Sequence, residues 1–212
     1  EGAASGPIYW RPLLLLAVII LLRSLTHPGA VPFLPLLFQQ KGWSATEFGA
    51  LTSLFWIAGA VLGISAGRLA ERYDRRAIIT VLIVLGSPMF WLLPRVDGAA
   101  ALLVALLAGG LTGAPHSLLV AEIQRLLPGR RGLASGAALG FIFAAGSLGN
   151  LIMGALSDAW SISAAFETVA ILGVVSGVLA WVLPWHVAPR QEPERGLSEP
   201  VAAPALPSIP QR

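Results

Sequence analysis

The sequence predicts an all-α membrane protein, with six transmembrane helices in one bundle followed by a disordered, proline-rich tail. Three observations support this fold class. The 212-residue chain is 56% hydrophobic and 12% charged, with a mean hydropathy of +0.76, whereas a soluble domain usually carries about 25% charged residues. Six stretches are apolar over roughly the 20 helical residues that a bilayer core requires. The arginines gather in the short segments between these stretches.

The six predicted helices follow one another with short connections and together occupy residues 12–184. Their approximate ranges are 12–38, 46–66, 77–93, 99–122, 133–155 and 162–183. The first is long enough to tilt and is interrupted by Pro28, Pro32 and Pro35. The second begins at a capping box, Ser-Ala-Thr-Glu at 44–47, in which the serine and glutamate side chains satisfy backbone amides.

Proline and glycine mark the remaining helices. The third predicted helix contains Pro88, the fourth contains Pro115, and Pro184 ends the sixth. Gly59 and Gly63 share one face of the second helix, and the fifth helix carries three glycines at the same spacing, Gly132, Gly136 and Gly140. Because lipid provides no hydrophobic drive between helices, such glycines favour close backbone contact. Ordinary packing and sliding during a functional cycle explain them equally well.

Arginine placement predicts the orientation of the bundle. One side receives eight arginines before the tail is counted: Arg11, Arg68, Arg72, Arg75, Arg76, Arg125, Arg130 and Arg131. The other side receives only Lys41 and Arg95. By the positive-inside rule, residues 1–11 form a cytoplasmic linker and both chain ends are cytoplasmic. Residues 185–212 form the disordered cytoplasmic tail, since six of the sixteen prolines lie between 189 and 210.

Composition also excludes several classes of function. The net charge is only +3 and its pattern serves topology, so no nucleic-acid partner is expected. Without cysteine there is neither a disulfide nor a thiolate metal site. Histidines at 27, 116 and 186 form no ligand set, and no phosphate-binding loop occurs. We therefore expect no enzyme, no metal and no cofactor. Because the chain begins at Glu1, we also expect a fragment or a cut product.

Two copies of one pattern lie about 87 residues apart. Gly67 and Glu71 close one apolar stretch, and Gly154 and Asp158 close another in the same way. Each unit contains three predicted helices, so an odd number of crossings inverts the second copy relative to the first. An inverted repeat of three plus three helices builds one half of many secondary transporters.

The segment 67–76, Gly-Arg-Leu-Ala-Glu-Arg-Tyr-Asp-Arg-Arg, resembles the Gly-x-Leu-Ala-Asp-Arg-x-Gly-Arg-Arg loop of the major facilitator superfamily. That loop joins the second and third helices of each six-helix half. Glu71 replaces the usual Asp and Asp74 the usual Gly, as is common in the carboxy-terminal half. Residues 127–136 resemble the family loop between the fourth and fifth helices. The resemblance covers about residues 11–185, and weakly extends to the fosmidomycin-resistance and drug-efflux branches.

The resemblance implies a carboxy-terminal half whose missing partner is an amino-terminal six-helix half or a second copy of this chain. It also implies that the first and fourth helices line a central cavity, and that Glu71 pairs with a helix of the other half. The spacing of Glu122 and Arg125 permits an ion pair. The predicted conformational latch consists of Gly67, Arg68, Glu71, Arg72, Arg75, Arg76, Glu122, Arg125, Arg130 and Arg131.

Four polar residues inside the apolar stretches are candidates for substrate binding or coupling: Arg23, His27, His116 and Asn150. An ionisable residue inside a membrane is a functional candidate by default. Arg23 keeps its charge, so it must pair, face water or meet an anion. Either histidine carries protons or is a neutral hydrogen-bonding residue beside a proline kink. Trp56 and Phe55 line an apolar pocket or, as the better interpretation, pack in the core.

The predicted function is one half of a multi-pass secondary transporter of the bacterial inner membrane. It moves a small solute by alternating access, most often at the expense of a proton gradient. Scarce buried charge favours a drug-like or apolar solute, hence an efflux antiporter for drug resistance, whereas Arg23 leaves an anionic substrate open. The alternatives are a non-transporting membrane scaffold or sensor and a truncated, non-functional fragment. The expected partners are the lipid bilayer, the missing half, a small molecule and protons.

Overall fold

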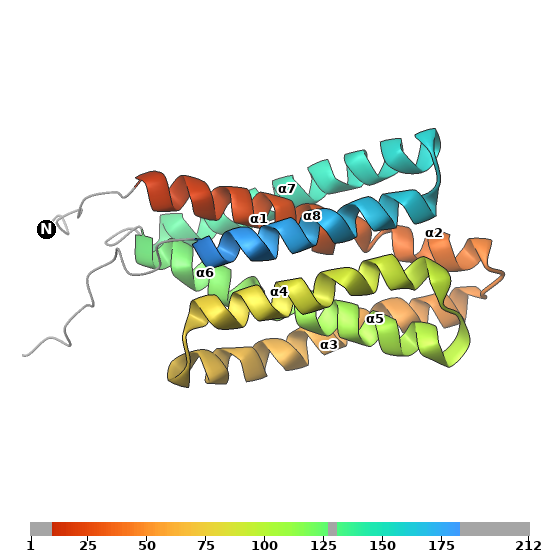
Figure 1. The fold of residues 1–212 in the computed structure, drawn as a ribbon, viewed down its shortest axis with the longest axis horizontal. Coiled ribbons are helices and arrows are strands. Elements are labelled where there is room, and N and C mark those ends of the chain that lie inside the picture. Colours follow the sequence, from red (N-terminus) through yellow and green to blue (C-terminus); the bar gives the residue numbers. More distant parts are fainter. Residues whose placement is uncertain (1–9, 127–130, 183–212) are drawn as a thin grey trace, which may run out of the picture.

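The computed structural model describes residues 10–126 and 131–182, and within these ranges every regular element is helical (Figure 1). The elements are α1 (Trp10–Ala30), α2 (Phe33–Gln40), α3 (Ala45–Arg72), α4 (Arg75–Leu92), the short 3₁₀ helix η1 (Leu93–Arg95), α5 (Gly98–Gly113), α6 (Pro115–Leu126), α7 (Arg131–Ala159) and α8 (Ile162–Val182). The predicted tail, most of the predicted linker and Arg130 lie outside the described residues.

Six helical segments are long and apolar enough to cross a membrane. They are 10–30, 45–72, 75–95, 98–126, 135–159 and 162–182. Each coincides with one predicted crossing, so the all-helical, six-span fold class is confirmed. The first begins at Trp10, because the end of the predicted linker is already helical.

The first predicted helix is in fact two helices. α1 ends at Ala30 and α2 begins at Phe33, although the apolar stretch continues to residue 38. Neither Pro32 nor Pro35 has a backbone N–H, so the carbonyls of Pro28 and Val31 lack their usual helical donors. The Val31 carbonyl instead accepts from the Leu34 N–H at 3.1 Å, which makes a tighter turn. Proline chemistry therefore breaks this crossing.

The fourth predicted helix is also broken, at Ala114 between α5 and α6. Pro115 follows the break and again cannot donate a backbone hydrogen bond. Pro115 and Pro28 are related by the same offset of about 87 residues that relates the two copies of the sequence repeat. The first crossing of each repeat unit is thus interrupted, but not at equivalent positions, since Pro28 lies inside α1 and the break follows Ala30.

Two other helices extend beyond their predicted ends. Residues 67–72, predicted as part of a loop, form the last turns of α3, and only Tyr73 and Asp74 separate α3 from α4. Asp74 caps α4 by accepting from the Arg76 N–H at 3.0 Å. α7 likewise continues to Ala159 rather than 155. The apolar pattern locates the membrane core, but helices continue into the polar zone where capping residues end them.

The predicted capping box at the start of α3 is confirmed. The Glu47 N–H donates to Ser44 Oγ at 3.4 Å, and the Ser44 N–H donates to Glu47 Oε2 at 2.7 Å. These two bonds satisfy backbone amides that would otherwise lack partners at the helix start.

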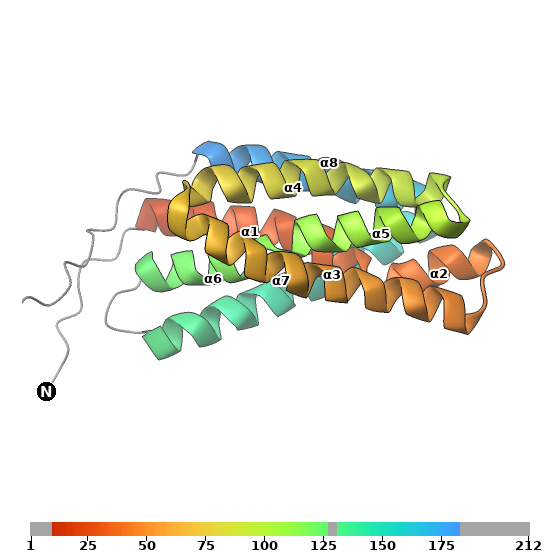
Figure 2. The same ribbon diagram turned by 90° about the horizontal axis from the view of Figure 1, so that it is seen from below.

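The helix packing obeys the inverted repeat. α3 packs most closely on α5, and α1 packs on α7; exchanging the two repeat units converts one pair into the other. α4 packs on α8, a pair that the exchange maps onto itself. In Figure 2, α4 and α8 lie along one face, α3 and α7 lie toward the opposite face, and α1 and α5 lie between them.

The connections between successive crossings alternate between the two ends of the bundle. The start of α1, the turn between α3 and α4, the end of α6, the start of α7 and the end of α8 share one end (Figure 1). Lys41 and Arg95 are at the other end, whereas the described arginines of the predicted arginine-rich side lie in elements at this shared end: Arg11, Arg68, Arg72, Arg75, Arg76, Arg125 and Arg131. We call these the arginine-rich end and the opposite end.

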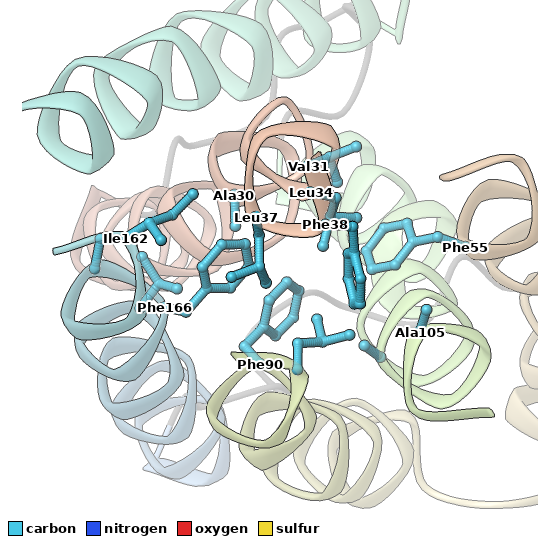
Figure 3. Close-up of a cluster of buried hydrophobic side chains, with 14 of the residues drawn as sticks. Ala30, Val31, Leu34, Leu37, Phe38, Phe55, Phe90, Ala105, Ile162 and Phe166 are labelled. Carbon is cyan, nitrogen blue, oxygen red and sulfur yellow. The ribbon is translucent and has the colours of Figure 1, made fainter. Parts of the chain in front are cut away.

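The core near the opposite end is aromatic. Phe38, Phe55, Phe90 and Phe166 are fully buried and face one another from four helices (Figure 3). The ring centroids of Phe55 and Phe90 are 6.0 Å apart, and those of Phe90 and Phe166 are 6.5 Å apart. Phe55 therefore packs in the core, so the favoured of its two interpretations is confirmed.

Polar contacts tie the connections together at the opposite end. The indole N–H of Trp43 donates to Asp97 Oδ1 at 2.6 Å, and Arg95 pairs with Glu167 of α8 at 2.6 Å. Hydrogen bonds from the Gly98 backbone N–H and the Trp43 indole lower the pKa of Asp97. Partial burial lowers the pKa of Lys41, and the nearby Asp97 carboxylate opposes that shift. Glu167 is thus a structural partner of Arg95.

Candidate functional site

A pocket of about 610 Å³ lies about halfway along the helices and opens to the surface of the bundle, where Trp56, Ile64 and Phe143 are exposed. α1 contributes Arg23, His27 and Pro28, and the other lining residues come from α3, α5, α6 and α7, with Ala114 between α5 and α6. Both repeat units therefore supply walls. The volume falls within the range of sites for small molecules.

Arg23 is almost fully enclosed, with 1% of its surface exposed. Its Nη2 donates to the backbone carbonyl of Thr112 at 2.6 Å and approaches that of Gly113 at 3.5 Å. These carbonyls lie in the last turn of α5, where four carbonyls lack intrahelical partners and the helix dipole is negative. The break before Pro115 thus creates the acceptors that hold the guanidinium group.

His27 lies one turn after Arg23 and bonds to the same residue of α5. His27 Nδ1 lies 2.8 Å from Thr112 Oγ1, and that hydroxyl donates to the Ala108 carbonyl at 2.6 Å. Because the hydroxyl hydrogen is already used, Nδ1 must carry a hydrogen, which leaves Nε2 of a neutral His27 as a free proton acceptor. The ring stacks on Phe55 at 5.1 Å and meets Trp56 edge-on at 5.5 Å.

Three of the four predicted polar candidates meet in this pocket. Arg23, His27 and His116 all line it, although His116 lies far along the chain on α6. Asn150 lies on α7 and does not line the pocket; its buried Oδ1 lacks a hydrogen-bond partner among the described residues. Trp56 also lines the pocket, with 51% of its surface exposed, so it is not a core residue.

Thr112 is the functional candidate that the sequence analysis missed. It is 1% exposed, and through its carbonyl and hydroxyl it contacts both Arg23 and His27. The available signal in the sequence was a threonine three residues before Pro115, a proline inside the fourth predicted helix. A helical threonine is so often satisfied by its own backbone that this signal is weak.

The predicted latch residues occupy the arginine-rich end but are not all joined. Glu122 is buried and accepts from Arg125 at 3.4 Å. The Arg76 guanidinium lies 4.4 Å from the ring centre of Trp181, and Arg75 is half-buried. Arg68, Glu71 and Arg72 are exposed helical residues, and Glu71 forms no ion pair with any described side chain. The side chain of Arg131 is not among those the structure describes.

The predicted packing glycines separate into two groups. A Cβ on Gly59 would lie 3.1 Å from the Gly109 carbonyl, and Gly63 faces Ala114 at 3.9 Å, so both adjoin α5 and the break after it. Gly67 and the three glycines of α7 have no such neighbour within 4 Å in the described chain: Gly132, Gly136 and Gly140. The close approach of α7 to α1 instead uses Gly146 and Gly149.

No group of three histidine, aspartate or glutamate side chains in residues 10–126 and 131–182 is arranged to hold a metal. The pocket itself brings together one permanent cation, Arg23, and two imidazoles, those of His27 and His116, which can form hydrogen bonds and take up protons.

Comparison with known proteins places the chain in a family context. The model of the Major Facilitator Superfamily matches residues 13–210. The chain is 31% identical over 140 residues to the "Uncharacterized MFS-type transporter YfnC" of Bacillus subtilis (strain 168), covering 63% of this chain and 34% of that protein. It is 30% identical over 127 residues to the "Fosmidomycin resistance protein" of Escherichia coli (strain K12), covering 60% and 30%.

A third relative aligns over more of the chain. The "Multidrug resistance protein MdtH" of Aeromonas salmonicida (strain A449) is 29% identical over 199 residues, which cover 88% of this chain and 48% of that protein. The alignments with these curated relatives span between 30% and 48% of the relatives' own length.

Proposed function

Because the chain belongs to the Major Facilitator Superfamily of membrane transporters, we propose that it forms one half of a secondary active transporter that works by alternating access. One observation carries the proposal: both units of the inverted repeat line a pocket, about halfway along the helices, that contains Arg23, His27 and His116. Substrate sites of such transporters lie near the bilayer midplane at repeat interfaces.

The substrate is a small, drug-like and largely apolar solute, and the direction is efflux. Apolar side chains of Trp56, Ile64 and Phe143 make up much of the pocket lining. Two relatives bear names that refer to fosmidomycin resistance and multidrug resistance, which supports a role in drug resistance.

The coupling ion is the proton, and the chain works as an antiporter. His27 and His116 are the side chains lining the pocket whose imidazole rings can take up and release a proton. The bare Nε2 of neutral His27 gives the proton a defined binding atom beside the pocket.

The partner that completes the transporter is an amino-terminal six-helix half or a second copy of this chain. α3 and α7, which flank the pocket, expose large apolar side chains outside it, among them Ile57, Val61 and Leu151. Exposed glycines at spacing four on α7 add a flat surface to the same helix. The latch residues at the arginine-rich end meet this partner, and the arginine-rich end is cytoplasmic in the bacterial inner membrane.

Transport is tested with the protein as its host expresses it. Ala60 of α3 is exposed and lines the pocket, so Ala60→Trp fills the pocket without removing a buried contact. We expect this variant to lose drug resistance in cells and drug-dependent proton movement in inverted vesicles. Leu85→Trp on α4, which is 54% exposed on the opposite face of the bundle, is the matched control and retains both.

The result that contradicts the proposal is equally concrete. If Ala60→Trp retains wild-type resistance and proton movement, the pocket is not the substrate site. If deletion of the gene changes resistance to no compound in a broad panel, the scaffold or sensor alternative, or the truncated fragment, is favoured.

A further inference from the structure

We infer that the pocket recognises an amphipathic organic anion, a small aromatic or aliphatic molecule that carries one carboxylate or phosphonate group. Arg23 binds the acidic group, and the apolar lining residues Trp56, Ile64 and Phe143 hold the body. This inference rests on the proposed function, which places the ligand in this pocket. What it adds is the charge of the ligand.

The first step is the charge balance around Arg23. Guanidinium groups stay charged in proteins, and a buried charge is normally paired. The two ion pairs among the described residues join Arg95 to Glu167 and Arg125 to Glu122, so neither includes Arg23. None of the pocket-lining residues in the described chain is acidic. Arg23 is therefore a buried cation without a carboxylate.

The second step is the unused hydrogen-bonding capacity of Arg23. A guanidinium group has five N–H donors, and the described partners, the carbonyls of Thr112 and Gly113, are reached by Nη2 alone. Nε is buried and has no partner among the described residues. The fork geometry of arginine suits a two-oxygen acid group, which would use donors that the backbone leaves free.

The third step is how much of the positive charge of Arg23 the negative end of α5 compensates. The carboxyl end of a helix carries the equivalent of about half a negative charge. This partial charge holds Arg23 in place without neutralising it. His27 and His116, the other ionisable groups of the pocket, are either neutral or positive. The pocket thus keeps a net positive potential.

The fourth step concerns the rest of the ligand. Trp56, Ile64 and Phe143 have between 51% and 69% of their surface exposed, and all three line the pocket. A simple inorganic anion would leave these surfaces in contact with water. A neutral solute would leave Arg23 unpaired, and a cation would be repelled. The combination of one buried cation with apolar walls fits an amphipathic anion.

The test compares matched naphthalene probes with the full-length protein in phosphatidylcholine nanodiscs. The probes are 2-naphthoate, 2-naphthylphosphonate, 2-naphthamide and 2-naphthylmethylammonium, and binding is measured by equilibrium dialysis and by the shift in melting temperature. We expect the two acids to bind at least about tenfold more tightly than the amide or the ammonium, the effect of one hydrogen bond to a charged group.

Variants assign this preference to Arg23. Arg23→Met should abolish the preference for acids while binding of the amide persists, and Arg23→Lys should restore part of it. Arg11→Gln removes an exposed arginine outside the pocket and should change nothing. Because Arg23→Met removes buried hydrogen bonds, its melting temperature is checked first, and His116→Gln provides a second variant that leaves the Arg23 contacts intact and should weaken acid binding.

A lipid headgroup is the other source of the same anionic chemistry. A further arm adds phosphatidylglycerol to the nanodiscs, where displacement of bound naphthoate supports an anion site that a headgroup can also enter. Binding of the lipid with no binding of either soluble acid overturns the inference. So do equal affinities for all four probes, a preference for the ammonium, or unchanged acid binding in Arg23→Met.

These outcomes are separable from those of the transport test. The binding measurement requires no gradient and no transport cycle, so a sensor that never transports would still prefer the acids. Conversely, in a transporter of neutral drugs Ala60→Trp would still lose transport, but the two acids would bind no more tightly than the amide.

Discussion

At the scale of single residues, the pocket depends on the way in which one threonine bonds to two cationic or titratable side chains. The Thr112 carbonyl accepts a hydrogen bond from Arg23, and the Thr112 hydroxyl accepts one from His27. The same hydroxyl donates to the Ala108 carbonyl. This chain of bonds fixes both the position of the guanidinium and the tautomer of His27. Loss of the hydroxyl would leave the Nδ1–H of His27 buried without an acceptor.

Thr112→Val tests this arrangement. We expect the free energy of unfolding to fall by about 1–2 kcal/mol, since a buried donor loses its partner. The measurement is reversible unfolding in mixed micelles. Thr52→Val is the matched control, because the Thr52 hydroxyl bonds only to the Phe48 carbonyl of its own helix at 2.8 Å. Equal losses in the two variants would show that the bond to His27 contributes nothing to stability.

At the scale of helices, close backbone contact determines which elements pair. A Cβ on Gly109 would clash with the Phe55 carbonyl, so α3 and α5 touch through their backbones. Across the repeat, a Cβ on Gly149 would lie 2.9 Å from Leu25 Cα, so α7 and α1 also meet through their backbones. In lipid such van der Waals contact replaces the hydrophobic effect as the force between helices.

Gly109→Ala should force α3 away from α5. Because the obstacle is backbone rather than a flexible side chain, we expect a loss of about 3 kcal/mol or more, at the upper end of overpacking effects. Gly49→Ala on α3 is the control, since nothing lies within 4 Å of its added Cβ, and it should leave stability unchanged or slightly raised. Denaturant titration of both proteins gives the comparison, and similar midpoints would contradict the close approach.

At the scale of the whole molecule, the inverted repeat and the arginine distribution describe one topology. Six helical segments are long and apolar enough to cross a membrane, and their connections fall alternately at the arginine-rich end and at the opposite end (Figure 1). Both repeat units contribute to the pocket, and both have a first crossing that is interrupted. The positive-inside rule predicts that the arginine-rich end faces the cytoplasm.

Cysteine labelling tests that orientation, and the chain offers a clean background because it contains no cysteine. Tyr73 and Trp160 are exposed, at 65% and 71%, in connections at the two different ends. A membrane-impermeant maleimide should label Trp160→Cys in intact cells, and Tyr73→Cys only after permeabilisation. Labelling of both positions from the outside would refute the six-span topology, and exchanged labelling would refute the orientation.

The sequence by itself determined the crossings, the capping box at Ser44 and the likeness between the two halves. These features are local or periodic: about 20 apolar residues span a bilayer wherever they occur, and a cap involves residues three apart. The sequence also shows prolines at 28, 32, 35 and 115 inside its predicted helices. It did not reveal which prolines break a helix: Pro28 and Pro88 lie inside intact helices, whereas the breaks occur at Pro32 and directly before Pro115.

Only the tertiary structure decided which polar residues meet. Arg23 and Thr112 are separated by 89 positions in the chain, and their contact exists because α5 ends where α1 passes it. The sequence listed Arg23, His27, His116 and Asn150 with equal weight, but packing brought three into one pocket and left Asn150 on α7 outside it. Packing also moved Trp56 to the pocket and Phe55 to the core, since neighbouring helical positions face about 100° apart and the approach of α5 covers only one of them.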